Sequence, residues 1–290
     1  MLSSARPLHP LFAAEISGIA VDGALAPDAV VEVVGHMDRY AVCLYRNAAP
    51  PDGEAQLAFS RLLGPMEETP ILKFTNRQFR LASRQMQDVS NLDENGEILA
   101  PDDIRRMRAA GNLLWHTDVS FHRVRATYSV LSAHVVPPAG AATEFADLRA
   151  AYDALPDTMK ARIEGLVAEH SYWHSRSLVG GLAPTPEELE KNPPAHHRLV
   201  QVHPGCGRKT LYLASHASHI VGMPVEEGRA LLAELTEFAT QERFVYRHEW
   251  RVGDVVIWDN RCTMHRATPY DDKAYRRDLR RTTVREAMVA

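Results

Sequence analysis

The stretch Leu113-Leu114-Trp115-His116-Thr117-Asp118 carries the residue pattern on which the fold and the chemistry of this chain depend. His116 and Asp118 are two residues apart, so in an extended strand both side chains leave the same face. An imidazole and a carboxylate on one face can bind the same metal ion. The pair is not decisive alone, because His-x-Asp also occurs by chance and the chain has 14 histidines.

A third ligand from a distant strand would complete such a centre. His265 follows an expected strand over residues 255–258 and is the candidate. Two histidines and one carboxylate form the facial triad typical of non-haem iron(II) oxygenases, which leaves open positions for O2 and a chelating cosubstrate. We therefore predict that His116, Asp118 and His265 bind iron(II) and form the catalytic centre.

A run of arginines near the C-terminus supports this hypothesis. If Arg276-Arg277-Asp278-Leu279-Arg280-Arg281-Thr282-Thr283 is a strand, alternation places on one face Arg277, Leu279, Arg281 and Thr283. The other face, which suits solvent, carries Arg276, Asp278, Arg280 and Thr282. A buried guanidinium is unfavourable unless it is paired, and its planar fork matches a carboxylate. Two inward arginines therefore predict carboxylate ligands, and a solvated basic strand is the alternative.

The bulk composition is typical of a globular protein, and we expect a single domain over residues 1–290, although the length alone would also permit two smaller domains. A formal charge of -4 disfavours a nucleic-acid partner. The chain shows neither a leader pattern nor a run of about 20 apolar residues, so a cytoplasmic protein without membrane contact is expected. The three cysteines, Cys43, Cys206 and Cys262, are far apart and are expected to be structural thiols.

Hydrophobic periodicity predicts helices over residues 27–39, 54–63, 101–110 and 224–241, and a helical pair over 147–155 and 156–167. Runs of β-branched and aromatic residues predict strands over residues 40–45, 126–136, 244–250, 255–258 and about 276–285. Residues 175–194 contain repeated prolines and a Gly-Gly pair, so a long loop that could serve as a lid is expected there.

Four motifs together resemble the taurine and 2,4-dichlorophenoxyacetate dioxygenases: Trp115-His116-Thr117-Asp118, Thr143-Glu144-Phe145, Trp258-Asp259-Asn260-Arg261 and His265-Arg266. The resemblance covers nearly the whole chain, and residues 147–156 and 216–219 look especially like the 2,4-dichlorophenoxyacetate branch. It implies a mainly β fold with a double-stranded β-helix (jelly-roll, cupin-like) core and flanking α-helices, with the triad at one mouth of the barrel. It also implies a homo-oligomer.

The resemblance further implies roles for individual residues. Thr143 and Arg277 would hold the distal carboxylate of 2-oxoglutarate, and Trp258 would line the same region. Arg281 would be the partner of the cosubstrate or of the substrate's own carboxylate. Asn112, four residues before His116, matches a substrate-contacting position, although a structural amide is an equal alternative.

Two regions depart from the family pattern. The loop after His265 is longer than expected, so Arg276 could replace Arg277, although parity with Arg281 favours Arg277. Lys73 stands where the phenoxyacetate branch carries a basic residue, whereas Glu97 stands where another basic residue is expected. Substrate carboxylate recognition at these positions is therefore an open question at the level of sequence.

The resemblance implies an iron(II)- and 2-oxoglutarate-dependent dioxygenase that uses O2 and acts on a small anionic aromatic substrate. It would hydroxylate the carbon next to the ether oxygen of an aryloxyacetate such as 2,4-dichlorophenoxyacetate, releasing a phenol, glyoxylate, succinate and CO2. An alkyl sulfonate such as taurine, or another carboxylic acid, is the alternative substrate. A non-oxidative jelly-roll metal-binding protein or zinc hydrolase is a remote alternative, because it has no need of a diacid anchor such as Thr143 and Arg277.

Overall fold

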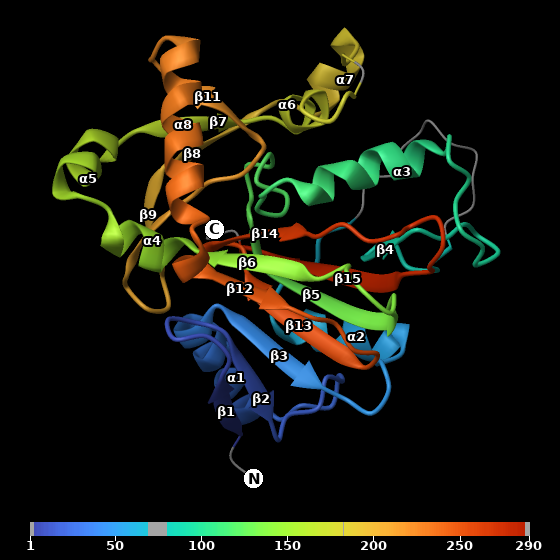
Figure 1. Ribbon diagram of the computed structural model, residues 1–290. Helices are drawn as coiled ribbons and strands as arrows, with labels where there is room; N and C mark the ends of the chain where they lie inside the picture. Colours follow the sequence, from blue (N-terminus) through green and yellow to red (C-terminus); the bar gives the residue numbers. More distant parts are fainter. Residues whose placement is uncertain (1–2, 69–79, 182, 288–290) are drawn as a thin grey trace.

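Two β-sheets that face each other form the centre of the computed structural model, which describes residues 3–68, 80–181 and 183–287 (Figure 1). The large sheet has the strand order β1-β2-β3-β13-β5-β15-β4, and the small sheet has the order β12-β6-β14. The strands of the large sheet are β1 Ser4–Pro7, β2 Ala14–Ser17, β3 Val42–Arg46, β13 Asp254–Asp259, β5 Ala126–Val135, β15 Asp278–Arg285 and β4 Met86–Ser90. Those of the small sheet are β12 Val245–His248, β6 Thr143–Asp147 and β14 Thr263–Ala267. This arrangement confirms the expected jelly-roll core with flanking helices.

Alternation along the central strands divides the apolar side chains between two cores. Even-numbered residues of β13, Val256 and Trp258, point between the sheets and pack with Phe145 of β6. Odd-numbered residues of the same strand, Val255 and Ile257, point to the opposite face of the large sheet. The continuous apolar run that predicted a strand here therefore contributes side chains to the cores on both faces of the sheet.

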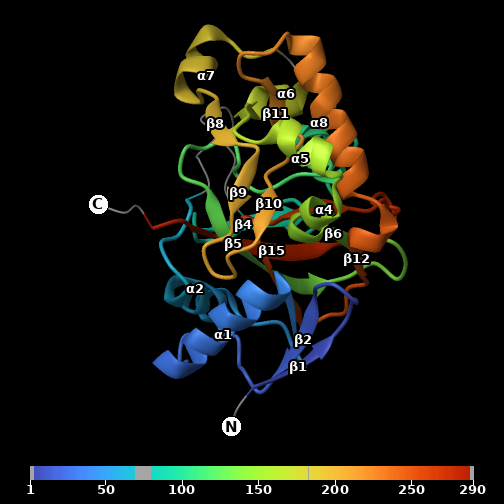
Figure 2. The same cartoon turned by 90° about the vertical axis from the view of Figure 1, so that its left-hand side faces the viewer.

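Helices α1 Pro27–Tyr40 and α2 Gly53–Leu62 cover that opposite face (Figure 2). Pro27 occupies the first turn of α1, where no backbone N–H is needed, and Asp52 caps α2 by accepting a hydrogen bond from the Ala55 amide at 2.8 Å. Both helices agree with the predicted ranges 27–39 and 54–63. α3 Ile104–Ala109 and the 3-10 turn η1 Ala110–Leu113 follow β4 and lead directly into the His-x-Asp motif.

A smaller body stands above the barrel and is inserted between β6 and β12 (Figure 1). Its helices are α4 Leu148–Ala154, α5 Asp157–Ile163, α6 Tyr172–Ser177, α7 Pro186–Lys191, α8 Val225–Ala239 and the 3-10 turn η2 Glu242–Phe244. Its strands are β7 Val167–His170, β8 Ala195–Arg198, β9 Val200–Val202, β10 Lys209–Leu211 and β11 Ala217–Ile220. The amphipathic α8 packs its apolar face, which includes Leu231 and Leu235, against this body, as its periodicity predicts.

Two predictions about this body are wrong. Residues 175–194 do not form one continuous loop, because α6 ends at Ser177 and α7 lies within the range. The prolines there mark a helix start, since Pro186 is in the first turn of α7 and Thr185 and Glu188 form a capping box. The helix expected to run to residue 167 ends at Ile163 instead, because Gly165 adopts a φ of +77° that stops it before β7.

The outer face of β15 also differs from the prediction that it faces solvent. Asp278 and Thr282 are buried, at 5% and 1% exposure, while Arg276 alone of that set is exposed. α2 covers Thr282, whose hydroxyl lies 2.6 Å from the hydroxyl of Ser60. Arg80 covers Asp278 with two hydrogen bonds of 2.7 and 2.8 Å. The two faces of β15 were therefore predicted correctly, but the face expected to contact solvent is covered by α2 and by the ion pair between Arg80 and Asp278.

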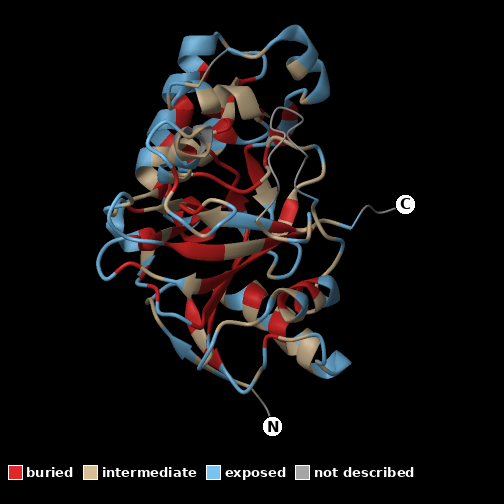
Figure 3. Cartoon of the chain, turned by 90° about the vertical axis from the view of Figure 1, so that its right-hand side faces the viewer, coloured by how far each residue is buried: buried red, intermediate tan, exposed pale blue. Residues whose placement is uncertain are grey.

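Buried residues are concentrated in the strands at the centre of the molecule, while the helices expose their outer faces (Figure 3). Cys43 and Cys262 belong to this interior, and burial raises the pKa of both thiols. Both agree with the expectation of structural thiols, and all three cysteines are free of disulfides. Within the described ranges, no helix has the length and apolar character needed to cross a membrane.

Candidate metal centre

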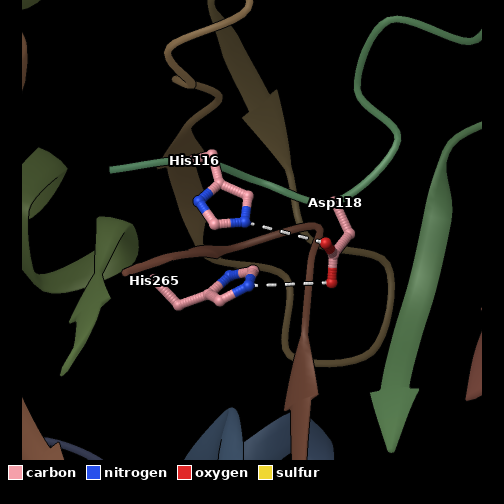
Figure 4. Close-up of side chains that lie close together, drawn as sticks. All are labelled: His116, Asp118 and His265. Atoms are coloured by element: carbon pink, nitrogen blue, oxygen red, sulfur yellow. Dashed lines mark ion pairs between the residues drawn. The ribbon is translucent and has the colours of Figure 1, made fainter. Parts of the chain in front are cut away.

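His116 and His265 face each other across an isolated antiparallel bridge, on the free edge of β14 in the small sheet. The His116 amide donates to the His265 carbonyl at 3.0 Å, and the His265 amide donates to the His116 carbonyl at 2.8 Å. This pairing brings the two imidazole rings to a centroid distance of 4.1 Å. Asp118 follows on the same segment as His116, and its carboxylate turns toward both rings (Figure 4). The structure thus brings His265 next to His116 and Asp118, as the sequence-based hypothesis requires.

The ligand atoms lie at distances that one metal ion can span. Asp118 Oδ1 is 3.9 Å from His116 Nε2, and Asp118 Oδ2 is 3.8 Å from His265 Nε2. Both separations are less than twice a usual metal–nitrogen or metal–oxygen distance of about 2.1 Å. His116 Nδ1 lies 2.8 Å from the Leu114 carbonyl, which makes Nδ1 the protonated nitrogen and leaves the Nε2 lone pair for a metal. The donor set fits iron(II), although metal binding itself stays a prediction.

The protonation states also suit metal binding. Burial lowers the pKa of His116 and lowers that of His265 well below its usual value, so both rings are held neutral. Burial opposes ionisation of Asp118, but the charge of the Arg281 guanidinium and the hydrogen bond from Ser129 favour the carboxylate, and the pKa of Asp118 is lowered to about 2. Two neutral imidazoles and one carboxylate are the forms in which these side chains bind metals.

Each carboxylate oxygen of Asp118 also accepts a hydrogen bond from another side chain. Arg281 forms an ion pair with Oδ1, and the Ser129 hydroxyl donates to Oδ2 at 2.7 Å. The sequence predicts that Arg281 lies beside the cosubstrate or the substrate. In the structure its guanidinium lies against the carboxylate of Asp118. Its Nε is buried and has no hydrogen-bond partner in the described part of the chain, so one donor is available for a further ligand.

Arg277 is the buried arginine of the pair Arg276 and Arg277. It is 8% exposed, and its guanidinium donates one hydrogen bond, of 3.3 Å, to the Val89 carbonyl. None of the described carboxylates forms an ion pair with Arg277. Burial lowers the pKa of Arg277 to about 10, while Tyr270 acts in the opposite direction. A buried cation without a counter-ion is unfavourable, so this site suits an anionic ligand.

Arg276 points elsewhere. Its side chain is 51% exposed and forms a surface ion pair with Glu97, whose side chain is 66% exposed. The unexpected acid at position 97 is therefore paired at the surface. These positions favour Arg277 as the inward residue, which agrees with the parity argument.

Thr143 begins β6 and is buried, with its hydroxyl accepting a hydrogen bond of 3.0 Å from Trp250 Nε1. Trp258 is fully buried, and its ring centroid is 4.6 Å from that of His265. Asn112 lies half-buried in η1, one turn before His116. Lys73 lies outside the described residues. The roles of these four side chains as cosubstrate or substrate contacts stay predictions.

The structure places further side chains near the centre. Of these, His216 lies in the segment 216–219 that resembles the family, whereas Phe121, Tyr172 and Arg176 stand in none of the motifs that carry the resemblance. Phe121 stacks edge-on with both Tyr172 and His216, at centroid distances of 5.2 and 4.9 Å, and His216 lies 6.4 Å from His116. Arg176 of α6 packs against Gly111, where a Cβ would lie 2.5 Å from its Nη2. These residues come from segments far apart in sequence, so no local pattern could have indicated that they meet beside the histidines.

A second group of possible ligands, His203, Asp259 and Cys262, lies within the described residues. Arg261 and His203 Nε2 already bind the Asp259 carboxylate, at 2.5 and 2.9 Å. Two backbone amides, at 3.2 Å each, occupy His203 Nδ1. Burial also raises the pKa of Cys262 well above its usual value. This group is therefore a hydrogen-bonded structural cluster with its acceptors filled.

A jelly-roll barrel with two histidines and a carboxylate converging at its mouth defines the class of cupin-like metal-dependent oxygenases. The family model described as taurine catabolism dioxygenase TauD, TfdA family matches residues 4–283. The chain belongs to this family, which confirms the resemblance that its motifs indicate.

Individual relatives cover almost the whole chain. An alpha-ketoglutarate-dependent 2,4-dichlorophenoxyacetate dioxygenase from Cupriavidus pinatubonensis (strain JMP 134 / LMG 1197) is 46% identical, over 98% of this chain and 99% of that protein. A crystal structure of AAD-2 in complex with Mn(II) and N-oxalylglycine is similar with a TM-score of 0.94 and 45% identity, over 99% of both chains. A taurine dioxygenase structure from Burkholderia xenovorans has a TM-score of 0.77 and 27% identity, over 98% of this chain and 91% of that one.

Proposed function

We propose that this chain is an iron(II)- and 2-oxoglutarate-dependent dioxygenase that cleaves aryloxyacetates such as 2,4-dichlorophenoxyacetate. The observation that carries the proposal is the combination of the three candidate ligands with Arg277, a buried guanidinium that has no ion-pair partner among the described residues. A zinc hydrolase would need the ligands but not a buried site for a second carboxylate. The family of the chain and the names of its relatives agree with this choice.

His116, Asp118 and His265 would hold the iron, and Arg277 with Thr143 would bind the distal carboxylate of 2-oxoglutarate. A charge-assisted hydrogen bond contributes roughly 1.5–3 kcal/mol, so Arg277 would supply much of the cosubstrate's binding energy. The relative AAD-2 was solved with Mn(II) and N-oxalylglycine, a 2-oxoglutarate analogue, which supports a metal and a diacid at the equivalent sites.

An aromatic acid fits the surroundings better than a small aliphatic one. Half-buried Phe121 packs edge-on against both Tyr172 and His216, and the His216 ring centroid lies 6.4 Å from that of His116. Aromatic pairs stabilise each other by roughly 0.5–1.5 kcal/mol beyond the burial of area, so a substrate ring would be favoured here. Arg281 would bind the substrate's carboxylate or assist the cosubstrate, with Asn112 and Lys73 as further proposed contacts.

Bound iron(II) would supply the oxygen activation that couples decarboxylation of 2-oxoglutarate, giving succinate and CO2, to hydroxylation of the substrate. The chain's own residues position the reacting carbon, satisfy both carboxylates and exclude water. Hydroxylation of the carbon next to the ether oxygen gives a hemiacetal, in which the carbon–oxygen bond to the aryl ether then breaks. The products are a phenol and glyoxylate.

Comparing two acids with the same enzyme tests the substrate assignment. The full chain, loaded with iron(II) and given 2-oxoglutarate and O2, should release phenol from 2,4-dichlorophenoxyacetate in step with succinate. Taurine should give a much lower kcat/KM for succinate formation. Succinate with taurine, or with another acid, but without phenol from aryloxyacetates would contradict the substrate assignment and favour the alternative acids.

We also propose that residues 1–290 act as one dioxygenase domain in a cytoplasmic homo-oligomer. The candidate site combines Asp118, Arg281 and His265 from distant parts of the chain, which supports one functional unit. Three free thiols suit a reducing compartment. Light scattering coupled to size exclusion tests the assembly, and a mass of one chain would contradict it.

A further inference from the structure

The carboxylate of Asp118 receives a hydrogen bond from a side chain that is itself oriented by a buried amide. Asn260 follows β13, and its Oδ1 lies 3.1 Å from Trp258 Nε1 and 3.2 Å from the Asp118 backbone nitrogen. An indole nitrogen and a backbone amide can only donate. The atom of Asn260 that faces them must therefore be its oxygen, which fixes the orientation of the whole amide group.

The fixed amide then orients Ser129. Asn260 Nδ2 lies 3.0 Å from Ser129 Oγ and can only donate to it. Because a serine hydroxyl has a single proton, that proton is directed to the remaining neighbour, Asp118 Oδ2, at 2.7 Å. The direction of every hydrogen bond in the series from Trp258 through Asn260 and Ser129 to Asp118 is thus determined.

Backbone pairing holds these side chains in register. Ser129 of β5 is the direct partner of Trp258 of β13 in the antiparallel ladder, and the Asn260 amide donates to the Thr127 carbonyl at 2.8 Å. Ser129, Trp258 and Asn260 are fully buried, so water does not compete for their hydrogen bonds. The two strands therefore present a rigid donor to a carboxylate that comes from a separate segment.

We propose that Asn260 and Ser129 are positioning residues, which hold Asp118 in the orientation needed to bind the metal. This inference rests on the proposed metal centre. Arg281 holds Oδ1 from a flexible side chain, whereas the Ser129 hydroxyl comes from the middle of a central strand. Partners that orient a metal-bound side chain commonly change metal affinity by about 10–100-fold when they are removed. The same range is expected when the Ser129 hydroxyl is lost.

Ser129→Ala tests the proposal, with Ser132→Ala as a matched control. Ser132 is also a fully buried serine on β5, but its hydroxyl donates to Gln56 Oε1 at 2.7 Å on the side of α2. Each substitution removes one buried hydroxyl from the same strand. A merely structural role of Ser129 would make the two variants behave alike.

The measurement is the dissociation constant for Mn(II) of the full-length protein, obtained anaerobically from the electron paramagnetic resonance signal of free Mn(II). We expect Ser129→Ala to raise this constant at least about 10-fold, and Ser132→Ala to leave it unchanged while lowering the melting temperature similarly. The visible absorption of bound Co(II), which reports ligand geometry, should change in Ser129→Ala alone.

The possible outcomes separate the inference from the proposed function. Equal Mn(II) affinity in Ser129→Ala and the unaltered protein would overturn the inference and leave the metal centre standing. An equal loss of affinity in both serine variants would also overturn it, because general destabilisation would then explain the effect. If the unaltered protein itself fails to bind Mn(II), the metal centre is contradicted, and the inference with it.

Discussion

At the scale of single residues, Arg276 and Arg277 are adjacent but occupy different environments. Arg277 is buried without a carboxylate partner in the described structure, whereas Arg276 pairs with Glu97 at the surface. We predict that Arg277→Gln raises the KM for 2-oxoglutarate by about 10-fold or more, because a charge-assisted hydrogen bond of roughly 1.5–3 kcal/mol is lost. Succinate formation at varied 2-oxoglutarate measures the change.

Arg276→Gln is the matched control for this prediction. It removes the same charge one residue away and should leave the KM for 2-oxoglutarate within about 2-fold of the original, since an exposed ion pair contributes little. If Arg276→Gln raised the KM and Arg277→Gln did not, the inward orientation assigned to Arg277 would be wrong.

The sequence was sufficient to identify the three candidate ligands and the arginines on the inward face of the last strand, because strand alternation and motif spacing are local properties. It was not sufficient to identify Ser129 as a neighbour of Asp118. That contact depends on β5 and β13 pairing so that Ser129 meets Trp258, a register set by the whole sheet. Asn260 lies inside a recognised motif, yet its role depends on the directions of its hydrogen bonds, which spacing does not encode.

At the scale of secondary-structure elements, β12 supports the end of β6. Their register pairs His248 with Thr143, and Trp250 lies just beyond, where its indole nitrogen donates to the Thr143 hydroxyl at 3.0 Å. The Thr143 proton is thereby free to point to another acceptor. We predict that Trp250→Phe raises the KM for 2-oxoglutarate by about 2–10-fold with little change in kcat, since a net hydrogen bond contributes about 0.5–1.5 kcal/mol.

Trp173 provides the control for this substitution. Its indole nitrogen is buried and has no hydrogen-bond partner among the described residues, so Trp173→Phe makes the same chemical change without removing a hydrogen bond. Its KM for 2-oxoglutarate should stay unchanged. An equal KM in Trp250→Phe and the unaltered protein would show that β12 does not orient Thr143.

The elements themselves were predicted unevenly, and the reason is again physical. Long amphipathic helices such as α1 and α8, and the apolar run of β13, carry strong local periodicity and were found near their observed bounds. Short strands of the upper body, β8 to β10, have three or four residues each and are held by tertiary pairing, so their sequences carry little signal.

At the scale of the whole molecule, buried neutral histidines couple stability to pH. His170 is fully buried, both of its ring nitrogens lack a hydrogen-bond partner within the described ranges, and burial lowers its pKa to about 3. The unfolded chain therefore binds a proton at higher pH than the folded one. Stability from this group is fully present above the unfolded pKa of 6.5 and is lost as the pH falls toward about 3.

We predict that His170→Leu makes unfolding less sensitive to acid. When the pH falls from about 7 to about 5, protonation of His170 in the unfolded chain should lower the free energy of unfolding by roughly 2 kcal/mol. The free energy of unfolding of His170→Leu should therefore fall by roughly 2 kcal/mol less than that of the unaltered protein over the same range. Urea unfolding of both proteins at the two pH values measures the difference. Equal losses in the two proteins would mean that His170 is already protonated or solvated in the folded state.

We propose above that the site formed by His116, Asp118 and His265 consumes O2 and 2-oxoglutarate together. The direct measurement is the yield of succinate and phenol from 2,4-dichlorophenoxyacetate after anaerobic loading with iron(II) and exposure to O2, beside an Asp118→Ala variant. We predict equal amounts of succinate and phenol from the unaltered protein and neither product from the variant. An absence of succinate with every acid tested, or undiminished succinate from Asp118→Ala, would show that these three residues do not form an oxygenase centre.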